Sequence, residues 1–88
     1  MRQGTVNVTT SPTLILSANG NRESVILYNS STLSVSIGYD TNISTNNVAI
    51  GPSGTLTEDN SGSKMYLGPY YGITSAGTAV VAVWERTK

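Results

Sequence analysis

The side chains that could do acid–base chemistry are few. The chain of 88 residues holds five carboxylates but no histidine and no cysteine, which excludes the usual nucleophile–base triads and most transition-metal sites. The carboxylates are Glu23, Asp40, Glu58, Asp59 and Glu85. Glycoside hydrolysis needs two carboxylates across a cleft, whereas Glu58 and Asp59 are neighbours at a strand end, where alternation sends them to opposite sides. We therefore expect no catalytic residue, no cofactor and no enzymatic activity.

One polar loop carries oxygen donors at a spacing that suits calcium. Asp40, Thr41 and Asn42 are followed by Asn46 and Asn47, and Ca²⁺ prefers clustered oxygen ligands. The same residue types also form turns in which Asp or Asn accepts a hydrogen bond from its own backbone. Because a site with one carboxylate would bind calcium weakly, the sequence favours the turn, and we expect no metal site.

The aromatic residues are five tyrosines and one tryptophan. Tyr66, Tyr70 and Tyr71 are close in sequence, and the bend GPYYG, residues 68–72, would present Tyr70 and Tyr71 side by side. Such rings stack on sugars or anchor protein interfaces, because one end is apolar and the other polar. The alternative is packing in a core that has no phenylalanine. For Trp84 we expect a place in the core or at a subunit interface rather than at a ligand.

Arg22 opens the central apolar segment and is followed by Glu23. Two interpretations stand side by side. The pair is either a solvated strand edge, where charge discourages unwanted pairing, or an ion pair across a subunit contact.

If the protein associates with other chains, we expect a small set of apolar and aromatic residues, with one arginine, to make the contact. These interface residues are Ile26, Tyr28, Tyr70, Tyr71, Trp84 and Arg22. Residues 1–7 would act as a clamp, within a possible N-terminal arm at residues 1–12.

The segments that must position these side chains are β-strands. Residues 24–29 are rich in β-branched and aromatic types, and residues 33–38 alternate apolar with small polar ones, which is typical of half-buried strands. The small polar residues 29–32 between them predict a hairpin loop. In that hairpin Val25 and Leu27 would share the apolar face of the second strand, while Ile26 and Tyr28 point the other way.

The remaining pattern is also β, and no segment has helical periodicity. Further strands are expected at residues 5–9, 13–17, 48–50, 55–58, 64–67, 70–74 and 79–85. In the last of these, Val81 and Val83 share one face, and Trp84 lies on the other. Turn signals recur at the spacing of a sandwich or barrel. The sequence therefore predicts an all-β protein: one domain over residues 1–88, a single small antiparallel β-sandwich or barrel of seven to eight short strands.

Composition narrows the classes of partner. The five basic and five acidic residues cancel, so no basic stripe points to nucleic acid. No apolar run approaches the roughly 18 residues of a membrane span, and the N-terminus lacks the apolar core of a signal peptide. Ser, Thr and Asn supply 32 of the 88 residues, which is typical of virion or extracellular β-proteins. A chain this short without disulfides is marginally stable alone, which favours association with copies of itself or with a larger body.

Two segments carry a resemblance to a known class of protein. Residues 22–29 (RESVILYN) and 35–38 (VSIG) resemble the pattern of small β-sandwich virion structural proteins and modules of tailed bacteriophages. In that pattern an Arg opens an apolar strand ending in Asn, and an alternating strand ends in Ile-Gly. The later parts of the pattern match residues 51–56, 66–73 and 77–84. The usual glycine in the loop after the first strand is missing here.

The resemblance implies a function but no site residue. Such proteins decorate or cement capsids, anchor head fibres or form tail parts, generally as homotrimers or other symmetric oligomers. It implies the major capsid protein or other virion proteins as partners, and a place in the virion after synthesis in the bacterial cytoplasm. The first hypothesis is thus a capsid decoration protein. The second is a carbohydrate- or receptor-binding β-module of a tail or head fibre, in which the aromatic residues would form a glycan platform open to solvent.

Overall fold

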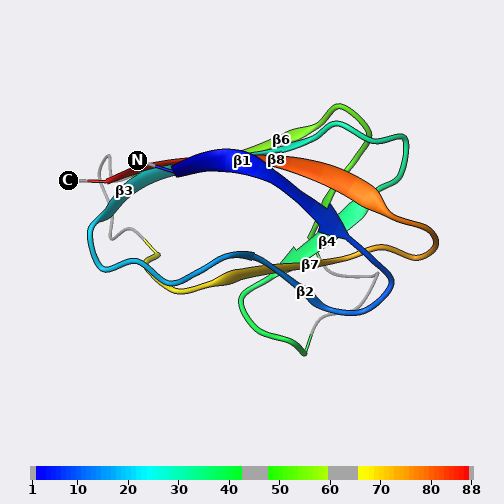
Figure 1. Cartoon of the computed structure of the whole chain (residues 1–88), viewed down its shortest axis with the longest axis horizontal. Coiled ribbons are helices and arrows are strands. Elements are labelled where there is room, and N and C mark those ends of the chain that lie inside the picture. Colours follow the sequence, from blue (N-terminus) through cyan, green and yellow to red (C-terminus); the bar gives the residue numbers. More distant parts are fainter. Residues whose placement is uncertain (1, 43–47, 60–65, 88) are drawn as a thin grey trace.

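A computed structural model describes residues 2–42, 48–59 and 66–87. Eight short strands form two four-stranded antiparallel sheets that pack face to face, with no helix among the described residues (Figure 1). The predicted all-β sandwich is therefore confirmed. The strands are β1 (Arg2–Val8), β2 (Thr13–Leu16), β3 (Arg22–Asn29), β4 (Val35–Gly38), β5 (Ala49–Ile50), β6 (Thr55–Asp59), β7 (Tyr70–Ile73) and β8 (Ala79–Thr87).

The two sheets have matching orders. Sheet A runs β1-β8-β3-β6 and sheet B runs β2-β7-β4-β5. Edge strands β1 and β2 thus lie on one side of the sandwich, and β6 and β5 on the other. The core between the sheets is made of aliphatic side chains and Tyr70. Its buried members are Val8, Ile15, Leu16, Val25, Leu27, Val35, Ile37, Ile50, Tyr70, Ala79, Val81 and Val83. No helix in the described ranges is long and apolar enough to cross a membrane.

The predicted central hairpin is wrong. Strand β3 pairs with β8 and β6 in sheet A, whereas β4 pairs with β5 and β7 in sheet B. Residues 30–34 therefore cross between the sheets instead of closing a hairpin. Val25 and Leu27 do meet Val35 and Ile37 in the core, but across the sandwich. Apolar alternation shows only that one face of a strand is buried. Because the facing sheet of a sandwich buries such a face, alternation does not show that two successive strands pair with each other.

Most other strand predictions agree with the structure to within a few residues. One differs in kind: Lys64 and Met65 lie outside the described residues, and Tyr66 and Leu67 belong to no strand. Residues 2–8, the larger part of the segment predicted as an arm, form strand β1 and pair along their whole length with β8.

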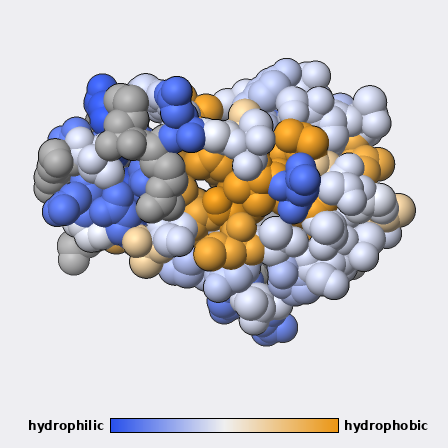
Figure 2. Space-filling model, in the orientation of Figure 1, coloured by the Kyte–Doolittle hydropathy of each residue, from blue (hydrophilic) through white to orange (hydrophobic). Residues whose placement is uncertain are grey.

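The side of the sandwich formed by β1 and β2 leaves part of the core visible. Figure 2 shows apolar surface in the middle of the face it presents. A small hollow of about 190 Å³ lies here, bordered by Val6, Ile15 and Val83. Gly4 lies on its border, and a Cβ atom at this position would meet no atom within 4 Å. The absent side chain of this edge-strand residue leaves the gap.

Candidate functional site: an outer sheet face and an edge hollow

The outer face of sheet A carries an apolar stripe along its two central strands. Ile26 of β3 lies directly opposite Trp84 of β8, and Tyr28 lies opposite Ala82. Alternation sends these side chains away from the core, because their neighbours Val25 and Leu27 are fully buried on the inner face. The stripe continues to Val80, which like Tyr28 is 38% exposed. We call these five residues, Ile26, Tyr28, Val80, Ala82 and Trp84, the outer stripe.

Uncharged polar side chains border the outer stripe on both sides. On β1, three exposed residues lie opposite the β8 residues of the stripe: Gln3, Thr5 and Asn7. On β6, Thr55 and Thr57 lie opposite Tyr28 and Ile26. A shallow groove of about 420 Å³ runs over the stripe and β1. Uncharged groups therefore fill the centre of this face.

The predicted interface residues are divided between three places. Ile26, Tyr28 and Trp84 come together on the outer stripe. Tyr71 is half-buried and lies on β7 of sheet B. Tyr70 and Arg22 are each only 1% exposed, inside the sandwich.

Arg22 is instead part of a buried ion pair within the chain. Its Nε lies 2.6 Å from Oε2 of Glu85, and both side chains are shielded from solvent. The guanidinium also donates to three backbone carbonyls: Nη1 to Tyr66 at 2.9 Å and Gly68 at 2.8 Å, and Nη2 to Ser17 at 2.8 Å. Arg22 therefore fits neither of the two alternatives that the sequence suggested for Arg22 and Glu23. Glu23 lies 3.8 Å from Arg86 in an exposed pair at the end of sheet A.

The bonds made by Arg22 position a cluster of tyrosines. Its guanidinium carbon lies 5.2 Å from the centre of the Tyr70 ring, a distance at which a cation is attracted to a ring face. Tyr66, held through its carbonyl, contacts the Tyr70 ring edge-on at 5.3 Å and the Tyr39 ring at 4.0 Å. Burial raises the pKa of Tyr66 above its usual value, and the neighbouring Tyr39 raises it further.

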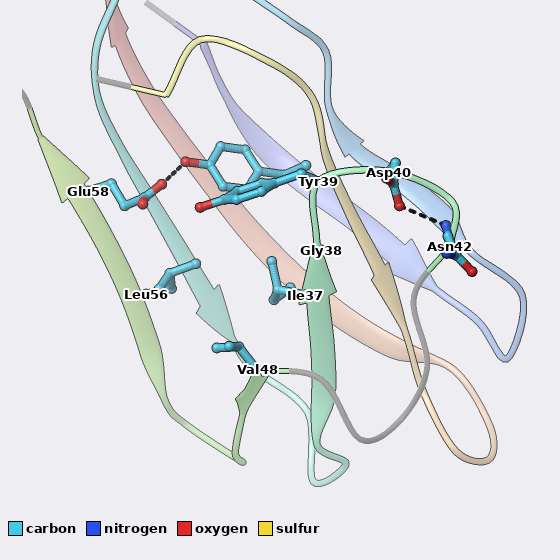
Figure 3. Close-up of a pocket in the computed structure, with 9 residues that line it drawn as sticks. Ile37, Gly38, Tyr39, Asp40, Asn42, Val48, Leu56 and Glu58 are labelled. Atoms are coloured by element: carbon cyan, nitrogen blue, oxygen red, sulfur yellow. Dashed lines mark hydrogen bonds between the residues drawn. The ribbon is translucent and has the colours of Figure 1, made fainter. Parts of the chain in front are cut away.

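Two members of this cluster, Tyr39 and Tyr70, line a hollow between the two sheets, on the side of β6 (Figure 3). Its volume is about 370 Å³, within the range of small-ligand sites, roughly 300–1,000 Å³. Apolar side chains and three polar ones line it together. The lining residues are Ile37, Gly38, Tyr39, Asp40, Asn42, Val48, Leu56, Glu58 and Tyr70. We call this space the edge hollow.

The polar groups of the edge hollow come from two elements. Glu58 of β6 accepts a hydrogen bond from the Tyr70 hydroxyl. After β4 the chain turns, and Oδ1 of Asp40 accepts a 2.9 Å bond from the backbone N–H of Asn42. This is the turn that the sequence favoured over a calcium loop; Asn46 and Asn47 lie outside the described residues. Within the described ranges, no group of three or more Asp, Glu, His or Cys residues could hold a metal ion.

Two buried polar residues were missed as organising elements in the sequence. The first is Glu85, which is 1% exposed; the signal that could have found it is that Glu85 shares the strand alternation of Val81 and Val83. The second is Asn29, which is fully buried at the point where the chain leaves sheet A. Its Nδ2 donates to the carbonyls of Leu33 at 2.5 Å and Ile50 at 2.9 Å. The residues that carry the resemblance at both ends of β3 thus have structural roles.

Comparisons of the chain with models of protein families, with curated proteins and with solved structures found no match. The function is therefore argued from the two surfaces themselves, the outer stripe and the edge hollow.

Proposed function

We propose that the chain is a non-enzymatic structural protein of a bacteriophage particle, a capsid decoration or cement protein that works as a homo-oligomer. The observation that carries this proposal is the outer stripe, in which Tyr28 and Val80 are exposed and Ile26 and Trp84 are partly exposed in the middle of a sheet. Apolar surface of this kind, rimmed by polar residues, is typical of protein interaction sites. The resemblance of residues 22–38 to virion proteins supplies the phage context.

The occupant that best fits the outer stripe is a further copy of the same chain. The stripe and its border of Gln, Thr and Asn carry no charge, and the whole chain is formally neutral. Identical copies can therefore meet there without electrostatic repulsion, which a charged centre would impose. Hydroxyl and amide groups on the border both donate and accept hydrogen bonds, so they also suit a self-complementary contact.

The stripe is two strands wide, on the order of 10 Å. Three copies that turn their outer faces toward a common axis would bury it, and three is the number that the resemblance implies. The whole four-stranded face measures roughly 500 Å² from strand spacing and rise, against about 800 Å² per partner in a standard stable interface. Contact between two copies is therefore modest in area.

A modest contact suits a protein that covers a lattice. Each copy that also touches the shell gains from the high local concentration of its neighbours, so many weak contacts add up to firm attachment. Binding to an assembled shell stabilises whichever state of the shell it favours. In this proposal the protein holds a capsid together by adhesion alone.

The test is a pair of charge substitutions. Ile26→Lys places a charge in the outer stripe, and Leu67→Lys places one at an exposed apolar residue away from it, where Leu67 is 39% exposed. Light scattering on the purified chain should show an oligomer for the unmodified protein and for Leu67→Lys, and a monomer for Ile26→Lys. Capsids mixed with each protein and sedimented should carry the first two and lose the third. A monomer at all concentrations, or an oligomer that Ile26→Lys leaves intact, would refute the assignment of this face.

A further inference from the structure

The edge hollow is a second surface that the proposed adhesive role does not use. We propose that it binds a neutral saccharide. It lies on the inner side of β6, where Leu56 and Glu58 face the space between the sheets, whereas Thr55 and Thr57 of the same strand border the outer stripe. The two surfaces therefore lie on opposite faces of β6, so one can be occupied while the other is buried.

The floor of the edge hollow suits the carbon face of a sugar ring. Ile37, Leu56 and Val48 supply aliphatic surface, and Figure 3 shows their side chains gathered between the two sheets. Val48 is 70% exposed and Leu56 is partly exposed, whereas Ile37 is buried at the base of the hollow. Pockets for small ligands combine such apolar lining with a few placed polar groups, and a sugar presents both C–H faces and hydroxyl edges.

Tyr39 supplies an aromatic ring that is both exposed and held in place. It is 53% exposed, yet its ring packs against Tyr66 at 4.0 Å and against the edge of Tyr70 at 5.9 Å. Tyr66 is in turn fixed by the bond from Arg22 to its carbonyl. A ring already ordered before binding loses little conformational entropy when a ligand stacks on it.

The polar groups match hydroxyl donors. Glu58 and Asp40 are acceptors, and the Asn42 side chain both donates and accepts. The bond from Tyr70 to Glu58 uses one oxygen of that carboxylate, Oε1, and the Asp40 turn uses Oδ1. The remaining oxygen of each carboxylate is placed to accept from a sugar hydroxyl, and carboxylates accept stronger hydrogen bonds than neutral groups.

The charge of the lining selects the class of saccharide. Among the described lining residues two are acidic and none is basic. A sialylated or phosphorylated sugar would place its negative charge beside Asp40 and Glu58 and be repelled. A neutral hexose or N-acetylhexosamine chain has no such penalty. The inference is thus a neutral glycan, and an organic cation is the competing ligand that the test must separate from it.

The test is a ¹H–¹⁵N NMR titration of the full chain with neutral trisaccharides of glucose, galactose, mannose and N-acetylglucosamine. Sialyllactose serves as the anionic probe and tetramethylammonium as the cationic one. At least one neutral trisaccharide should shift the amides of Gly38, Tyr39 and Leu56 saturably. Tyr39→Ala should weaken that binding about tenfold or more. Tyr28→Ala, which removes a tyrosine from the outer stripe, should change the affinity by less than about twofold.

Further variants guard against a folding defect in Tyr39→Ala. Glu58→Gln keeps an acceptor for Tyr70 and removes the charge, and Asn42→Ala truncates an exposed side chain. Each variant should bind the saccharide more weakly, while its NMR spectrum keeps the chemical-shift dispersion of a folded sandwich. The inference is overturned if no neutral trisaccharide shifts these amides, if all three variants bind as the unmodified chain does, or if tetramethylammonium or sialyllactose binds more tightly. A monomer that binds the saccharide would remove the adhesive proposal and leave this one standing.

Discussion

Arg22 and Glu85, 63 residues apart, meet inside the sandwich with Nε 2.6 Å from Oε2. Adjacent strands β3 and β8 carry them, and the guanidinium holds three carbonyls from the segments around it. Buried charges of this kind are tolerated only while each remains paired. This ion pair therefore ties sheet A to the segments that enter and leave sheet B.

Removing one charge of this pair should be costly. Glu85→Gln leaves a buried guanidinium without its counter-charge, and we expect a loss of about 3–5 kcal/mol in the free energy of unfolding. Urea unfolding followed by the fluorescence of Trp84, the one tryptophan, measures it. The double variant Arg22→Met with Glu85→Leu should recover only part of the loss, because the carbonyls of Ser17 and Gly68 lose their donor. A Glu85→Gln protein as stable as the unmodified chain would contradict this account.

The hydrogen bonds of Asn29 lead us to expect that two substitutions at this position differ in their cost to stability. Its Nδ2 donates to the carbonyls of Leu33, Ile50 and Gly51, and its Oδ1 accepts from the backbone N–H of Ser31 at 3.0 Å. Asn29→Asp replaces the donor by an oxygen facing carbonyl oxygens, so the loss should exceed about 3 kcal/mol.

Asn29→Ala separates lost bonds from added repulsion. It removes the hydrogen bonds without adding charge, and should therefore cost less than Asn29→Asp in the same urea experiment. An equal cost for both would show that the three carbonyls do not govern the position.

The sequence predicts the features of this fold that depend on neighbouring residues, and it does not predict those that depend on contacts between distant segments. Alternation is local, so it correctly put Val81 and Val83 on one face of their strand and Trp84 on the other. In the same way it separated Ile26 and Tyr28 from the face that carries Val25 and Leu27. Strand pairing is not local: nothing near Arg22 shows that β8 will lie beside β3. The hairpin error has the same origin, since residues 29–32 are equally suited to a turn within a sheet and to a crossing between sheets.

The same distinction between local and long-range features applies to the two candidate surfaces. The orientation of each outer-stripe residue was predictable, but their meeting on two adjacent strands required the pairing of β3 with β8. The edge hollow could not be predicted from the sequence, because its lining combines the turn after β4 with strand β6, which belong to different sheets. Glu85 shares the alternation of Val81 and Val83, but Arg22 is 63 residues away in the sequence, so the alternation alone did not identify the ion pair.

Tyr66 predicts a loss of stability in alkaline solution. Burial chiefly, and then the nearby Tyr39, raise the pKa of Tyr66 in the folded chain, whereas the pKa of this tyrosine in the unfolded chain is about 10. The unfolded state then releases its proton first, so stability is fully present below about pH 10 and is lost as the pH rises through the higher folded value. Urea midpoints measured from pH 7 to pH 11 report this loss.

The variant Tyr66→Phe isolates the contribution of that hydroxyl. It loses the 2.8 Å bond to the carbonyl of Pro69, at a cost of about 1 kcal/mol at neutral pH. Its midpoint should then fall less steeply between pH 9 and pH 11 than that of the unmodified chain. Parallel curves for the two proteins would mean that another tyrosine carries the effect.

Two glycines predict opposite outcomes for the same substitution. Gly4 lies on the edge strand β1 beside the hollow at Ile15 and Val83, where an added Cβ atom would have no neighbour within 4 Å. Gly4→Ala restricts the unfolded chain and adds apolar surface to a gap, so the free energy of unfolding should rise by about 0.4–1 kcal/mol. At Gly72 a Cβ would lie 2.6 Å from Cδ1 of Ile15 and 3.2 Å from Cγ1 of Val35. Gly72→Ala should therefore destabilise by about 1–3 kcal/mol through overpacking, and urea unfolding that ranks the two variants in the reverse order would show that the gap at β1 is filled in solution.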